Sequence, residues 1–128
     1  MGLKRSVSLA SGLRYQGGGP MLAFILHRIS GLAIAIFVAL HILASFLTQQ
    51  FGSDAGIFIN TIYEHWIFQI FIVFFALMHV INGLRIVILD LWPALLEHQR
   101  EATWVEWFIF LPIFGLAVFI LIQNGLSG

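Results

Sequence analysis

Three long stretches of apolar residues dominate the chain. They cover about residues 21–48, 65–91 and 104–123, and no formally charged side chain occurs from 29 to 47. A transmembrane helix needs about 20 predominantly apolar residues. The pattern therefore predicts an all-α membrane protein with three transmembrane helices, joined by a loop over 48–64 and a polar connection over 94–103.

The basic residues outside these stretches predict how the helices are oriented. Residues 1–20 form a glycine-rich arm with Lys4, Arg5 and Arg14, and the connection between the second and third helices carries Arg100. The other connection and the C-terminal residues carry no lysine or arginine. Because cytoplasmic loops collect these two residue types, we expect the N-terminus inside and the C-terminus outside. The arm does not have the pattern of a secretory signal peptide.

Composition narrows the class of protein further. Of the 128 residues, 60% are hydrophobic and 9% are charged, the formal net charge is zero and there is no cysteine. A soluble domain has about 45–50% apolar and about 25% charged residues. The composition argues against a soluble monomer and a nucleic-acid-binding protein, and it excludes disulfides and cysteine-ligated clusters within the chain. Lipid and partner helices are expected to cover its surface.

Two histidines are expected near the middle of the membrane. An ionisable side chain at that depth costs about 2.5–3.5 kcal/mol, so it usually marks a functional face. His41 lies in the first stretch, and His79 lies in the second with Asn82 and Gly83 on the same helical face. The missing side chain of Gly83 predicts space beside His79 for a flat porphyrin. Each histidine is therefore either a haem ligand or a hydrogen-bond partner between helices.

A cluster of charged and basic side chains is predicted at the cytoplasmic ends of the first two helices. His27 and Arg28 stand at the start of the first helix, and Arg85 and Asp90 stand at the end of the second. If these side chains lie at the same depth in the membrane, they would neutralise haem propionates or hydrogen-bond a quinone carbonyl. The alternative is that the arginines extend to the lipid headgroups.

The positions of Arg28 and Asp90 also predict how deep His41 and His79 lie in the membrane. If Arg28 and Asp90 both mark the inner membrane surface, His41 and His79 lie at similar depths, with His41 slightly deeper. Three further polar residues are expected to be solvated at the interface, namely His65, His98 and Glu106.

Two motifs in this order resemble a known family. Residues 27–31 read His-Arg-Ile-Ser-Gly, which resembles the H-R-x-[ST]-G motif of the succinate dehydrogenase cytochrome b subunit. Residues 79–85 read His-Val-Ile-Asn-Gly-Leu-Arg and are followed by Asp90, which resembles the H-x-x-x-G-x-R-x-x-x-x-D motif of that family. The resemblance covers roughly residues 21–125.

The resemblance implies a haem b-binding membrane anchor of succinate:quinone oxidoreductase, or complex II, in a bacterial cytoplasmic membrane. Such a subunit forms a helical bundle with a second small anchor subunit and holds a flavoprotein and an iron–sulfur protein at the cytoplasmic face. It performs no chemistry alone. Two alternatives stay open, namely the anchor of a quinol:fumarate reductase and a haem-free transmembrane scaffold.

The resemblance also implies roles for individual residues. His79 corresponds to the axial haem ligand, and Gly31 and Gly83 belong to the two motifs around it. His27 and Arg28 correspond to residues at the haem propionates and the quinone.

The chain departs from the family pattern at two positions, which changes the residue roles that the resemblance implies. Many members have a quinone-binding serine where this chain has Phe24, so Ser30 is the substitute candidate, together with Asp90. Many members also have a histidine where this chain has Ile86. These departures point to another bacterial branch, with menaquinone or ubiquinone as the quinone.

His41 gains a candidate role from related anchors that bind two haems. Its place, ten residues after Gly31, is similar to that of the distal haem ligand in those anchors. The resemblance thus implies one or two haems, each with one ligand from a partner subunit. Ligation of a single haem by both His41 and His79 is disfavoured, because directly packed helices lie about 8–10 Å apart.

Overall fold

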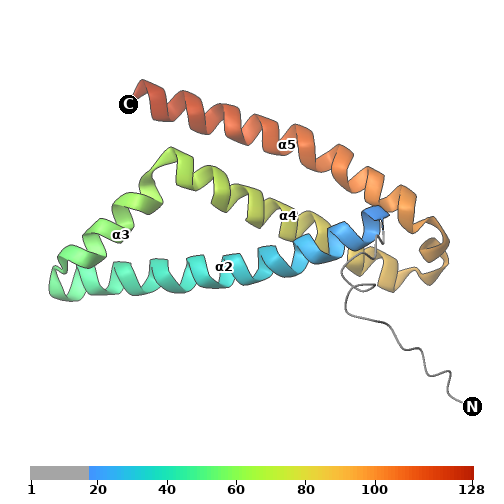
Figure 1. Ribbon diagram of the computed structural model, residues 1–128, viewed down its shortest axis with the longest axis horizontal. Helices are drawn as coiled ribbons and strands as arrows, with labels where there is room; N and C mark the ends of the chain where they lie inside the picture. Colours follow the sequence, from blue (N-terminus) through green and yellow to red (C-terminus); the bar gives the residue numbers. More distant parts are fainter. Residues whose placement is uncertain (1–17) are drawn as a thin grey trace, which may run out of the picture.

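The computed structural model describes residues 18–128. Helix α2 (Gly18–Phe51) is followed by α3 (Asp54–Glu64), α4 (Trp66–Leu91), the 3₁₀ turn η1 (Pro93–His98) and α5 (Gln99–Ser127). Figure 1 shows α4 between α2 and α5, with α3 leading from the far end of α2 back to the start of α4. Three helical segments are long and apolar enough to span a membrane, which confirms the predicted all-helical, three-span fold.

Helix α2 begins earlier than the sequence pattern predicts. Gly18, Gly19 and Pro20 are helical, although they were expected to belong to the N-terminal arm. Proline is tolerated there because the amide groups of a first helical turn have no partner within the helix. As a result, His27 lies more than two turns inside the helix. The rest of the predicted arm, residues 1–17, lies outside the described residues.

The predicted loop between the first two spans is wrong, because most of it is helix α3. Gly52 ends α2 in the left-handed conformation, with φ of 59° and its amide bonded to the Thr48 carbonyl. Ser53 then caps α3 by accepting a hydrogen bond from the Gly56 amide at 3.4 Å. The glycines and Asp54 that suggested a loop therefore end one helix and begin the next.

Helix α3 folds back along α2 because both helices carry small residues where they meet. Gly56 and Ala44 are buried, and Thr48 donates a hydrogen bond to the Ala44 carbonyl. At the other end of α3, the His65 side chain accepts a hydrogen bond from the Ile67 amide and so caps α4. Only His65 separates α3 from α4.

Aromatic side chains pack α4 against α5. Phe110 is 2% exposed and makes an edge contact with Phe74, and Phe114 stacks on Phe110 with ring centroids 5.3 Å apart. Farther along, Gly125 lies directly against the Trp66 ring, where a side chain would collide with the indole. The aromatic contacts and this close approach keep the two helices together over most of their length.

Most large apolar side chains on the outside of the described bundle are exposed. Examples from three helices are Leu32 at 65%, Leu84 at 59% and Phe108 at 81%. Exposed apolar area on this scale is unfavourable in water and marks a surface that lipid or partner proteins cover. The fold therefore fits a membrane environment on physical grounds as well as by helix length.

We expect Gly56→Ala to loosen the hairpin of α2 and α3. A Cβ atom at this position would lie 2.5 Å from Thr48 Oγ1 and 2.7 Å from the Ala44 carbonyl oxygen. Overpacking of this kind costs about 1–3 kcal/mol. The expected result is a lower unfolding midpoint when the detergent-solubilised protein complex is titrated with SDS.

Gly115→Ala on α5 is the matched control, since a Cβ atom there would meet nothing within 4 Å. It is expected to leave the midpoint unchanged or to raise it, because alanine is the better helix former. Equal losses in the two variants would contradict the packing role of Gly56.

Candidate functional site

Two histidine rings stack between α2 and α4. The centroids of His27 and His79 are 4.2 Å apart and the rings are nearly parallel, at 6°. His79 Nδ1 lies 3.3 Å from the His27 carbonyl oxygen and 3.3 Å from Ser30 Oγ. Ser30 itself donates to the same carbonyl at 2.8 Å. The His79 ring is therefore held from α2 by a backbone carbonyl, a hydroxyl and a stacked imidazole.

Two glycines allow these rings to fit between the helices. A Cβ atom on Gly31 would lie 3.0 Å from His79 Cε1, and one on Gly83 would lie 3.3 Å from His27 Cε1. The space that the sequence predicted beside Gly83 is thus filled by the His27 ring rather than left for a porphyrin. The physical reason is that His27 lies deep enough along α2 to face α4.

The partners of His79 indicate which ring nitrogen is available to a ligand. A carbonyl oxygen can only accept, so the contact with the His27 carbonyl favours the tautomer with hydrogen on Nδ1. Nε2 then carries the lone pair, and it makes no hydrogen bond to any residue within 18–128. Metal-ligating histidines commonly donate their second nitrogen to a carbonyl in this way.

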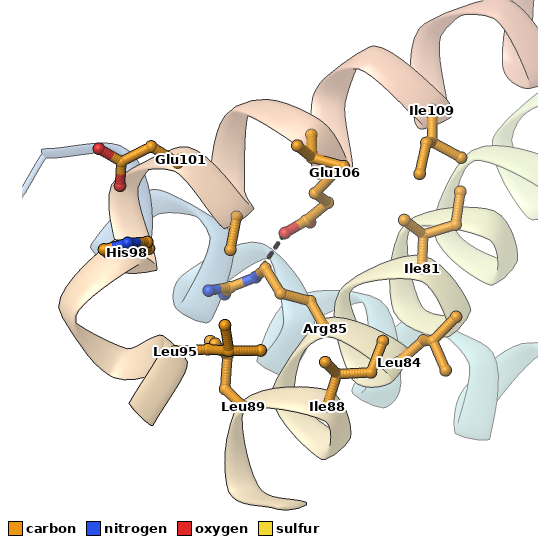
Figure 2. Close-up of a pocket in the computed structure, with 12 residues that line it drawn as sticks. Ile81, Leu84, Arg85, Ile88, Leu89, Leu95, His98, Glu101, Glu106 and Ile109 are labelled. Atoms are coloured by element: carbon orange, nitrogen blue, oxygen red, sulfur yellow. Dashed lines mark ion pairs between the residues drawn. The ribbon is translucent and has the colours of Figure 1, made fainter. Parts of the chain in front are cut away.

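A buried polar network joins all three spanning helices next to the histidine pair. Asn82 donates to the Ala23 carbonyl on α2 at 2.8 Å. Its side-chain oxygen accepts from Arg85 Nε at 3.1 Å and from Nη2 at 2.9 Å. Arg85 Nε also lies 2.6 Å from Glu106 Oε2 on α5, and both side chains are almost completely buried. Figure 2 shows this ion pair bridging the two helices.

The predicted solvation of Glu106 is wrong, since this residue is only 3% exposed. Helix α5 begins at Gln99, several residues before the expected start at 104, so Glu106 lies about two turns inside the helix. An acid near the start of one apolar stretch and an arginine near the end of the preceding one were the sequence signal for this pair. The other two residues of that group, His65 and His98, are exposed.

Of the four residues predicted to meet at the cytoplasmic ends, His27 and Arg85 lie in the same region of the bundle, since the His27 ring lies against Gly83 and Arg85 is two residues farther along α4. His27 faces His79, and Arg85 is paired with Glu106. Arg28 is exposed, with its guanidinium carbon 5.4 Å from the centre of the Phe24 ring.

The two remaining quinone candidates differ in accessibility. Asp90 is exposed at the end of α4. Ser30 is completely buried and its hydroxyl donates to the His27 carbonyl, so it is not open to a quinone in this structure.

His41 lies in a separate, more polar pocket of about 510 Å³ between α2, α3 and the start of α4. Its ring is exposed and lies 5.1 Å from the Tyr63 ring. Tyr63 donates to the Phe37 carbonyl at 2.6 Å, and burial raises the pKa of its phenol. Ser45, Asn60, Glu64 and Gln69 complete the polar wall of the pocket.

The two central histidines lie at different depths, contrary to the sequence prediction. His79 faces residues 27–31 of α2, whereas His41 lies ten residues beyond Gly31. That separation is about 15 Å along the helix axis. One haem between both imidazoles is therefore incompatible with this arrangement of the helices.

Comparison with known proteins agrees with the motifs around this site. The sequence model of the succinate dehydrogenase/fumarate reductase transmembrane subunit matches residues 1–122. The chain belongs to this family. It is also similar to the succinate dehydrogenase 2 membrane subunit SdhC of Mycobacterium tuberculosis, with 28% identity over 100 residues that cover 76% of this chain and 73% of that protein.

Family membership gives the described helices a setting. The chain is a membrane-anchor subunit of complex II and a multi-pass membrane protein. Its exposed apolar surface is accordingly covered by lipid and by other subunits of the complex. The polar network and the histidine pair are then the features of its interior that need a functional explanation.

We expect Glu106→Ala to destabilise the anchor by about 3–5 kcal/mol, because removal of one member of a buried ion pair leaves an uncompensated charge. The measurement is the thermal midpoint of the solubilised complex, followed by size-exclusion chromatography after heating.

The variant Arg85→Leu/Glu106→Leu removes both charges and serves as the comparison. It is expected to be more stable than Glu106→Ala, since neither charge then remains buried without a partner. The reverse order would contradict the importance of the ion pair.

Proposed function

We propose that this chain is the haem b-binding anchor of a succinate:quinone oxidoreductase. The observation that carries the proposal is the setting of His79, whose Nδ1 contacts a backbone carbonyl and whose Nε2 is left to bind iron. The family assignment supports the same role but does not itself name a cofactor. Succinate oxidation would occur on the flavoprotein, and the iron–sulfur protein would deliver electrons to the membrane.

The donor set of this chain fits a haem better than a bare metal ion. Within residues 18–128, no three histidine, cysteine, aspartate or glutamate side chains gather at a point where they could hold a metal. A haem brings four ring nitrogens of its own and needs only axial ligands from protein, as a histidine provides. The second axial ligand would come from the partner anchor subunit. Bound there, the haem would supply one-electron transfer.

The residues around His79 would determine how firmly its imidazole is oriented. The His27 carbonyl and the Ser30 hydroxyl hold Nδ1, and the His27 ring restricts rotation by stacking. A hydrogen bond on the second nitrogen raises the basicity of a ligating imidazole. His27 and Ser30 would therefore act through His79, although neither would contact iron.

The quinone site would be shared with other subunits. Arg28 is the best candidate contribution from this chain, because its guanidinium is exposed on α2. Asp90, exposed at the end of α4, is a second candidate. Both menaquinone and ubiquinone present carbonyl oxygens that a guanidinium can bind. The same residues would serve a quinol:fumarate reductase, because direction depends on the potentials of quinone and flavin.

We expect His79→Ala to remove a low-spin b haem from the purified complex. The measurement is the reduced-minus-oxidised absorbance spectrum, with haem content determined per protein. An unchanged spectrum would contradict ligation by His79, and a wild-type complex without a Soret band would favour a haem-free scaffold.

His65→Asn is the matched control, because His65 is an exposed histidine of the same chain. Its side chain caps α4 by accepting from the Ile67 amide at 3.3 Å, and asparagine is a preferred residue at that position. This variant is expected to keep the wild-type haem content.

A second haem at His41 extends the proposal. The pocket of about 510 Å³ beside His41 supports it, as does the distance of His41 from the His79 site. His41→Ala is expected to remove this second haem and to spare the haem at His79. Unchanged haem content in His41→Ala would mean that the complex holds one haem.

A further inference from the structure

Helix α3 carries its polar side chains on the side that faces the protein. Asn60 donates to Thr48 Oγ1 at 3.4 Å, and Tyr63 donates to the Phe37 carbonyl at 2.6 Å, so both residues bond to α2. The buried Gly56 lies on the same side, four residues before Asn60. A helix at an aqueous surface has the opposite arrangement, with its polar face turned to water.

Between its two terminal acids, the outward side of α3 is mostly apolar. Ile57 is 48% exposed, Phe58 is 67% exposed and Ile62 is 40% exposed. The sequence contains no lysine or arginine from 29 to 84. Glu64 lines the polar pocket that α3 shares with α2. The outward side therefore lacks both the polar coverage that suits water and a cation that would attract an anionic partner.

This apolar side continues into a groove where α3 meets α4. Figure 1 shows the two helices joining at an angle, and the groove beside their junction has a volume of about 350 Å³. Pockets of about 300–1,000 Å³ are typical of small-molecule sites. The apolar walls of the groove are Phe58, Ile62, Ile67, Phe68 and Phe71. Walls of this kind fit a hydrocarbon chain.

The two polar side chains of the groove indicate what kind of molecule the hydrocarbon chain belongs to. Thr61 donates its hydroxyl to the Ile57 carbonyl of its own helix at 2.9 Å. His65 Nδ1 accepts from the Ile67 amide at 3.3 Å, so Nε2 carries the ring hydrogen. No aspartate, glutamate, lysine or arginine lines the groove. The groove thus offers one free donor, on the exposed ring of His65, and no formal charge.

A phospholipid of the surrounding bilayer matches this combination. Its acyl chain is hydrocarbon, and its ester oxygens accept hydrogen bonds, as the Nε2 donor requires. A protein interface, by contrast, carries about one hydrogen bond per 100–200 Å². We propose that the groove between α3 and α4 binds an acyl chain of a bilayer phospholipid, with an ester oxygen at His65.

The bound chain has a structural consequence for the pocket beside His41. His65 alone separates α3 from α4, and the groove lies on the apolar side of this junction. An acyl chain in the groove packs against both helices and so stabilises the angle between them. That angle places Tyr63 and Glu64 in the wall of the His41 pocket.

Photo-cross-linking from inside the groove tests this assignment in the complete complex, reconstituted into phosphatidylcholine liposomes. A benzophenone analogue of phenylalanine replaces Phe71, which lines the groove from α4 and is exposed. Mass spectrometry of the digested chain is expected to find phosphatidylcholine attached to the peptide that contains position 71. A cross-link to another subunit would show that protein covers the groove and would overturn the assignment, as would the absence of any adduct.

Thr61→Trp separates a bound chain from lipid that merely surrounds the bundle. The indole fills the groove from α3, and the lost hydroxyl bonds only within its own helix. The yield of lipid adduct at position 71 is expected to fall about tenfold, as for a tenfold weaker dissociation constant. Ile62→Trp fills the same groove from the next position and is expected to give the same loss.

Val80→Trp is the matched control, because Val80 is an exposed α4 residue that does not line the groove. It is expected to give the adduct yield of the unfilled groove. Equal yields in Val80→Trp and both filling variants would mean that the probe reacts with bulk lipid, and the proposed site would be overturned. The SDS unfolding midpoint of each variant verifies that the complexes compared are folded.

Discussion

The buried pair of Arg85 and Glu106 fixes how the three spanning helices lie against one another. A charge inside a membrane bundle needs a partner, and this pair can form only when α4 and α5 meet at one level. Asn82 extends the same constraint to α2 through the Ala23 carbonyl. Because His79 lies one turn from Asn82 on that face of α4, the network also positions His79 against α2. The geometry proposed for haem binding therefore depends on an ion pair that touches neither histidine.

The two halves of the bundle are held by different forces. Near η1 the contacts are polar, and they specify register because each donor has few acceptors within reach. Toward the other end the contacts are aromatic, such as those of Phe74 and Phe110, and close, such as that of Gly125 with Trp66. Helix α3 fills the space where α2 and α4 diverge and creates the polar pocket beside His41. One chain thus offers two histidine sites at different depths.

The proposed electron transfer would need groups that other subunits of the complex hold. The described interior of this chain provides an available ring nitrogen on His79, and its outer surface consists largely of exposed apolar side chains. A second axial ligand, the flavin and the iron–sulfur clusters would all belong to other subunits. The chain contains few charged residues because three apolar spans make up most of it. Those that it buries hold the helices together.

The sequence by itself determined the number and nature of the spans, because about 20 apolar residues in a row have few alternatives to a membrane helix. The two motifs also identified the family. The meeting of Arg85 with Glu106, the stacking of His27 on His79 and the depth of His41 came only from the tertiary structure. Each depends on how far neighbouring helices slide and rotate relative to each other. Hydropathy is nearly the same for many such arrangements, whereas a few specific contacts between distant residues select one.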